Sequence, residues 1–122
     1  MGVFIDRHRM QDVAPAVRHQ LQLEAAHGIR DVSGTLPLGH WLEDGTIYCL
    51  LEAPDEEAVC RHHRGRGITC NDMHPLPGLS ATRPLTGRDR LAIMAAIQHL
   101  WHTPEDAEPL RLYQFSRNDP EA

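Results

Sequence analysis

The first apolar segment of the chain alternates with a period of two. Residues 3–8, VFIDRH, are rich in β-branched and aromatic side chains and contain neither glycine nor proline. This pattern predicts a strand with two distinct faces. One face carries Val3 and Ile5, and the other carries Phe4, Asp6 and His8.

The next apolar positions, Val13, Val17 and Leu21, repeat every four residues. This spacing predicts an amphipathic helix. We expect Asp12 to cap the helix at its N-terminus and the helix to run to His27, with Pro15 tolerated in the first turn.

Asp44-Gly45 separates two apolar runs, which is a strong signal for a β-hairpin. The first strand is expected at 36–42. In the second strand, Ile47, Cys49 and Leu51 share one face, and Tyr48, Leu50 and Glu52 share the other.

A second helix is predicted at 56–65, after an Asp55 cap, and a weak fourth strand at 69–76. The order of elements is therefore β-α-β-β-α-β. This order is typical of an α+β, ferredoxin-like antiparallel sheet, which we place in residues 1–76.

Residues 77–122 form a C-terminal extension. A linker leads to Gly87, Thr86 and Asp89 can form a capping box, and the following helix, 88–101, is apolar on most sides. Such a helix must be buried, so we expect the extension to pack on the core or on a second subunit. Residues 110–115 could add an edge strand.

The length of 122 residues fits one compact domain with an extension. The formal net charge is −5, and all twelve basic residues are arginines spread along the chain, which argues against a nucleic-acid partner. No apolar run approaches the roughly 20 residues needed to span a bilayer, so no membrane partner is expected.

Three cysteines, Cys49, Cys60 and Cys70, leave one unpaired in any disulfide scheme. The N-terminus lacks the pattern of a secretory signal. We therefore expect free thiols or metal ligation rather than disulfides, and a cytoplasmic location.

The predicted topology brings several candidate ligands to one end of the sheet. His8, Cys49 and His63 can converge there. Asp6 could be a further ligand, or it could accept a hydrogen bond from one of the ligands. Glu52 is expected at the opposite end of the sheet. His40, Tyr48 and His62 lie at the same end as the trio. Imidazole and thiolate ligands suit zinc, nickel or copper.

Each of these residues also has a simpler interpretation. Cys49 could be a small core residue, and His8 and His63 could be surface or helix-end histidines. A separate zinc site is conceivable from Cys60-x2-His63 and Cys70-x3-His74, although the gap between the two pairs is short. A nucleophilic Cys49–His63 pair is the weakest alternative, because Cys49 lies in an apolar run.

Three stretches, FIDRHRM, HGIR and TIYCLLEAPDEEAVCRHHRGRG, resemble the small bacterial nickel-binding family known as the DUF4242 domain. The resemblance covers about residues 3–76 and places family positions on Asp6, His8, Cys49 and His63. It implies a ferredoxin-like fold, a homodimer, and nickel or another divalent metal. The chain departs from the family at Val17 and Gln20, where a histidine and an aspartate are often found, and in its long C-terminal extension.

Three hypotheses follow. The first is a dimeric protein that binds a divalent transition metal, nickel by resemblance and otherwise zinc or copper, and stacks the sheet face bearing Phe4, Tyr48 and Leu50 on its mate. The second is an enzyme, such as an isomerase, cyclase or hydrolase, that holds a small-molecule ligand between sheet and helices, with the 88–101 helix as a lid. The third is an interaction module whose C-terminal segment docks a partner.

Overall fold

A computed structural model describes residues 1–79 and 85–102. Four strands form one antiparallel sheet in the order β2-β3-β1-β4. They are β1 (Gly2–Arg9), β2 (Leu36–Glu43), β3 (Thr46–Ala53) and β4 (Met73–Pro75). This order confirms the predicted ferredoxin-like α+β fold, although the fourth strand is shorter than expected.

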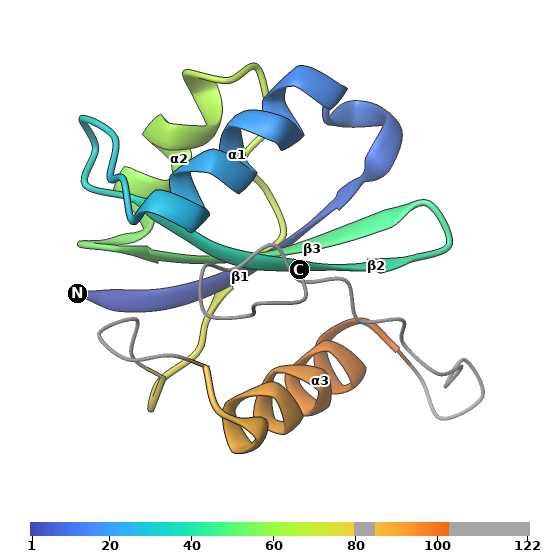
Figure 1. Ribbon diagram of the computed structural model, residues 1–122. Coiled ribbons are helices and arrows are strands. Elements are labelled where there is room, and N and C mark those ends of the chain that lie inside the picture. Colours follow the sequence, from blue (N-terminus) through green and yellow to red (C-terminus); the bar gives the residue numbers. More distant parts are fainter. Residues whose placement is uncertain (80–84, 103–122) are drawn as a thin grey trace.

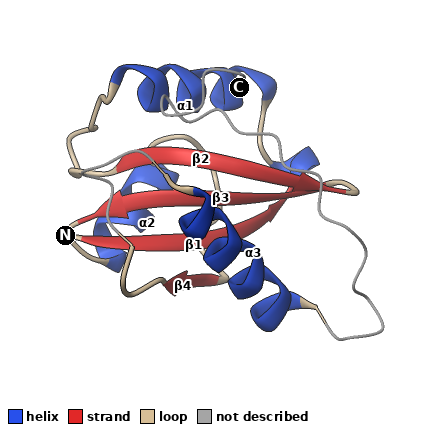
Figure 2. Ribbon diagram, turned by 60° about the horizontal axis from the view of Figure 1, so that its bottom comes forward, coloured by secondary structure: helices blue, strands red, loops and turns tan. Residues whose placement is uncertain are grey.

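Helices cover both faces of the sheet. Figure 1 shows α1 (Pro15–His27) and α2 (Glu56–Arg64) on one face and α3 (Gly87–Trp101) on the other. Figure 2 shows α3 lying across the strands. No helix among the described residues is long and apolar enough to cross a membrane.

Local signals explain most of the element boundaries. Asp44 and Gly45 both adopt positive φ, 33° and 78°, in the two-residue turn that joins β2 to β3. Asp55 caps α2 by accepting a hydrogen bond from the backbone N–H of Ala58 at 2.8 Å. Thr86 and Asp89 form the predicted capping box of α3.

The predicted start of the first helix is wrong. Asp12 ends a short 3-10 helix, Met10–Asp12, and α1 begins only at Pro15, with extended Ala14 before it. The physical reason is that a residue preceding proline is disfavoured in the helical region. The Asp12 carboxylate instead accepts a hydrogen bond from Arg9.

The sheet separates two apolar cores. Beneath α1 and α2, Phe4, Val13, Ile47, Cys49, Leu51, Ala53, Ala58, Val59 and Ile68 pack together. On the other face, Val3, Ile5, Leu36, Leu38, Trp41, Tyr48 and Leu50 pack with Leu85, Ile93 and Ile97, of which the last two belong to α3.

This arrangement overturns the expectation of an open sheet face for a dimer mate. Phe4 lies on the face that α1 and α2 cover, while Tyr48 and Leu50 are buried under α3 of the same chain. Because α3 and α1 lie on opposite faces of the sheet, α3 is also not a lid over a pocket between sheet and helices. The possible strand at 110–115 lies outside the described residues.

Candidate metal centre

Two adjacent elements bring three candidate ligand side chains, one carboxylate and two imidazoles, to one buried point. Asp6 and His8 share one face of β1, and His63 lies in the last turn of α2, which packs above that face. Oδ2 of Asp6 lies 2.5 Å from Nε2 of His63 and 3.1 Å from Nε2 of His8. The two Nε2 atoms are 3.2 Å apart.

These three residues form a compact group of candidate ligands. One ligand atom from each lies within 4.8 Å of the other two. Relative exposures are only 1% for Asp6, 7% for His8 and 2% for His63. Nδ1 of His63 donates a hydrogen bond to the carbonyl oxygen of Val59 at 2.8 Å, which leaves Nε2 directed at the other two residues.

The electrostatics of the group favour a charged carboxylate. Burial alone would raise the pKa of Asp6, but hydrogen bonds from His63 and His8, together with their charges, lower it to about 2. For His63, burial lowers the pKa, but the Asp6 hydrogen bond and charge outweigh it and raise the pKa. Asp6 is therefore an anion that attracts positive charge to this point.

One atom of the group is left without a conventional partner. Oδ1 of Asp6 is buried and accepts no hydrogen bond within the described part of the chain. An unsatisfied buried carboxylate oxygen is costly, and a cation can compensate it. Two imidazoles and one carboxylate are a donor set that first-row divalent ions accept, so the residues fit a metal ion.

Cys49 lies beside this group without belonging to it. It is directly opposite Asp6 in the β1–β3 pairing and is buried. Burial and the neighbouring Asp6 charge raise the pKa of the Cys49 thiol well above its usual value. A neutral thiol is a poor ligand until a metal displaces its proton, so Cys49 as a ligand stays a prediction.

The other residues expected at this end have separate partners or positions. His40 lies on β2, directly opposite Cys49, and burial lowers its pKa to about 3. His62 pairs with Glu24 of α1, with 3.4 Å between Nε2 and Oε2. Glu52, which was expected at the opposite end of the sheet, lies opposite Val3 and forms an ion pair with Arg30.

The expectation of three free or metal-ligating cysteines is wrong. Cys60 and Cys70 form a disulfide, and Cys49 alone is free. The alternative zinc site from Cys60, His63, Cys70 and His74 is therefore not formed. Sequence spacing could not reveal the pairing, because it depends on the loop after α2 folding back along the helix.

Sequence patterns also missed a buried polar network around α1. Glu24 is almost fully buried, forms an ion pair with Arg66 and a hydrogen bond with His62, and Arg66 also contacts Asp31. Burial and the Arg66 charge lower the pKa of His62 to about 4. One sequence feature could have indicated this network. Glu24 comes three residues after Leu21, so it lies on the buried, otherwise apolar side of the helix.

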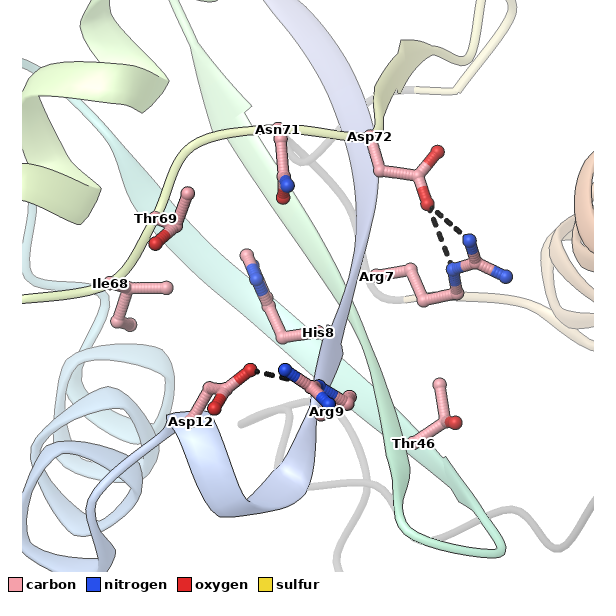
Figure 3. A pocket seen from close by; sticks show the side chains of 9 residues that line it. All are labelled: Arg7, His8, Arg9, Asp12, Thr46, Ile68, Thr69, Asn71 and Asp72. Atoms are coloured by element: carbon pink, nitrogen blue, oxygen red, sulfur yellow. Dashed lines mark hydrogen bonds and ion pairs between the residues drawn. The ribbon is translucent and has the colours of Figure 1, made fainter.

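Two hollows adjoin the candidate centre. The inner one, between sheet and helices, has a volume of only about 10 Å³, room for about one water molecule, and is lined by His8, Cys49 and His63 among others. The outer one is an open polar cleft of about 460 Å³. Figure 3 shows His8 in this cleft between the end of β1 and the loop that carries Thr69, Asn71 and Asp72.

Comparisons with known proteins found one matching family and one similar solved structure. A family model described as "Nickel responsive protein SCO4226-like" matches residues 4–76. Among solved structures, the crystal structure of SCO4226 from Streptomyces coelicolor A3(2) is 34% identical to this chain. The match covers 65% of this chain and 99% of that one, with a TM-score of 0.48. No curated protein matches the chain.

Proposed function

Because the chain belongs to the SCO4226-like family of nickel-responsive proteins, we propose that it binds a divalent transition metal ion through Asp6, His8 and His63. The observation that carries the proposal is the convergence of three ligand side chains on one buried point. The family match covers the residues that contribute all three side chains.

Nickel is the first choice of metal, and zinc and copper are the alternatives. Imidazole nitrogen suits all three ions, so the ligands alone do not select one of them. The family description supports nickel. When bound, the ion would act as a charge that compensates Asp6, including its Oδ1 atom, while His8 and His63 supply neutral nitrogen donors.

Cys49 is assigned as a fourth ligand or as a wall of the site. It faces the same small cavity as His8 and His63, which supports either role. A thiolate ligand would favour softer ions, whereas a wall would exclude water and strengthen the attraction between Asp6 and the ion.

Equilibrium dialysis followed by elemental analysis tests the proposal. Protein purified without a His tag or chelating resin should take up one Ni²⁺ per chain. His8→Ala and His63→Ala should lose this uptake, while exposed His27→Ala serves as the matched control. Unchanged metal stoichiometry in both site variants would show that the assignment is wrong.

We also propose that the protein is a homodimer, as the family resemblance implies. The sheet face first considered for this contact is buried under α3, so another surface must serve. Light scattering coupled to size exclusion, with and without Ni²⁺, measures the mass directly. A monomer mass at every concentration and metal content would end this part of the proposal.

The structure gives less support to the enzyme hypothesis in its original form. A cavity of about 10 Å³ between sheet and helices cannot hold an organic substrate. A cytoplasmic location remains a prediction. Disulfides are rare in the reducing cytoplasm, so the Cys60–Cys70 disulfide bears on this prediction. Counting the free thiols of protein isolated from cells tests it.

A further inference from the structure

The two candidate histidine ligands differ in what their second ring nitrogen contacts. Nδ1 of His63 donates to the Val59 carbonyl oxygen. Nδ1 of His8 makes no hydrogen bond to any residue in the described ranges, 1–79 and 85–102. A histidine that binds a metal through Nε2 carries its proton on Nδ1, and this N–H ordinarily has an acceptor. The acceptor for His8 must therefore come from outside the described chain.

His8 lines the open cleft of about 460 Å³, which has room for such an acceptor. The cleft is formed by the end of β1, the 3-10 helix after it, the start of β3 and the loop after α2. Figure 3 shows Thr69 and Asn71 beside the His8 ring, and Thr46 lines the cleft farther away. The side chains of these three residues form no hydrogen bond with other described residues, so their donors and acceptors are available to a ligand.

Charges at the cleft set the class of ligand. Arg7 is held by Asp72 through two contacts, 2.8 Å from Nε and 2.7 Å from Nη2. Arg9 contacts Asp12 only once, at 3.2 Å, and their side chains are 73% and 53% exposed. Such an exposed pair contributes little stability, so Arg9 can turn to a ligand.

The two arginines are balanced by two aspartates, which disfavours a multiply charged anion. A single carboxylate carries only one negative charge and is also a hydrogen-bond acceptor. It can accept a hydrogen bond from the His8 imidazole N–H and another from the guanidinium of Arg9. Neutral hydroxyl groups on the same molecule would match the threonine and asparagine side chains.

We propose that this cleft binds a small hydroxy monocarboxylate whose carboxylate accepts a hydrogen bond from Nδ1 of His8 and an ion pair from Arg9. Its coupling to the metal rests on the proposed function. A carboxylate hydrogen-bonded to Nδ1 makes Nε2 a better donor to the ion, so the ligand and the ion each raise the affinity for the other by the same factor.

Lactate is the probe for the test, in protein loaded with diamagnetic Zn²⁺ at constant ionic strength, because Nδ1 of a metal-bound His8 carries the proton that the carboxylate accepts. Titration followed by NMR should give saturable shifts at the His8 ring nitrogens and at the amides of Thr46 and Asn71. Arg9→Gln should weaken lactate binding about tenfold, which corresponds to losing one charge-assisted hydrogen bond. Arg88→Gln, exposed on α3 at the other face of the sheet, should leave the affinity unchanged.

Three results would overturn the proposal: shifts that chloride reproduces, an affinity that Arg9→Gln does not alter, or tighter binding of inorganic phosphate than of lactate. A second titration uses metal-free protein, where Nε2 of His8 faces Asp6 and lactate should bind several-fold more weakly. If metal uptake fails but lactate still binds the metal-free protein, the proposed function falls and the cleft assignment stands. If the metal binds and lactate does not, the cleft assignment alone is wrong.

Discussion

Oδ2 of Asp6 and Nε2 of His63 lie 2.5 Å apart, although the two residues are separated by 57 positions in the sequence. The contact ties α2 to the central strand β1 at a point where both side chains are almost fully buried. Because Asp6 has a lowered pKa and His63 a raised one, this contact favours opposite charges on the two side chains before any ion binds.

Asp6→Asn should therefore destabilise the metal-free protein and weaken metal binding. Removing one partner of a buried pair leaves the other charge uncompensated and costs about 3–5 kcal/mol. Urea unfolding measures the stability, and Ni²⁺ titration of the same variant measures the affinity. Asp12→Asn, at an exposed position, is the control. Equal stability and affinity in Asp6→Asn and wild type would contradict the assignment.

Substitution at Cys49 separates its two assigned roles. If Cys49 is a wall, Cys49→Ala should keep Ni²⁺ affinity within a few-fold and lower stability only through the small cavity it leaves. If Cys49 is a thiolate ligand, the affinity should fall by about 10²-fold or more, and the sulfur-to-nickel charge-transfer absorption should disappear. The free thiol is buried next to Asp6, so we expect the wall.

Periodicity in the sequence was enough to predict the sheet and the pairing of Asp6 with His8. The two-residue repeat puts both on one face of β1. The Asp44-Gly45 turn sets the register of β2 and β3, which places His40 opposite Cys49. The last turn of α2 then brings His63 above Asp6 and His8. These are local rules, and each holds because no distant contact opposes it.

Features that depend on distant contacts could not be predicted. The disulfide forms because the loop after α2 returns along the helix, which no cysteine spacing reveals. The burial of Glu24 becomes tolerable only when Arg66 arrives from 42 residues later in the chain. The sequence also could not show which surface α3 packs on. The apolar pattern of α3 was compatible with packing on the core or on a second subunit, and only tertiary packing decides between them.

Breaking the disulfide should lower stability. A Cys60→Ala/Cys70→Ala variant releases a loop of about ten residues, for which chain-entropy arguments give about 2–3 kcal/mol. Thermal unfolding with and without a phosphine reductant measures the effect. The reductant should lower the Tm of wild type and leave that of the double variant unchanged. Three reactive thiols in wild type denatured without reductant would show that the disulfide is absent.

The buried histidines should make the metal-free protein sensitive to acid. Burial lowers the pKa of His62 to about 4 and that of His40 to about 3, against 6.5 for an exposed histidine. Between these values the unfolded chain binds more protons, so stability falls as the pH falls, by about 1.4 kcal/mol per pH unit for each group. His63, with its raised pKa, acts in the opposite direction and only above pH 6.5.

Urea unfolding in the presence of a chelator, at pH 6 and pH 5, measures this slope. His62→Gln should reduce it by about half, because one of the two groups is removed. His27→Gln, exposed on α1, should leave it unchanged. A slope in His62→Gln equal to that of wild type would mean that another group titrates in this range.

Packing of α3 on the sheet should stabilise the fold without forming the metal site. Ile93 and Ile97 are fully buried against Val3, Ile5 and Leu50, so Ile93→Ala should cost about 2–5 kcal/mol. Leu91→Ala, at a position that is 69% exposed, should cost less than about 0.5 kcal/mol. The candidate metal ligands lie on the opposite face of the sheet, so Ni²⁺ affinity should stay unchanged in folded Ile93→Ala. If the Ni²⁺ affinity of Ile93→Ala falls together with its stability, α3 supports the metal site through the sheet. If the stability of Ile93→Ala equals that of wild type, α3 does not pack on this face of the sheet.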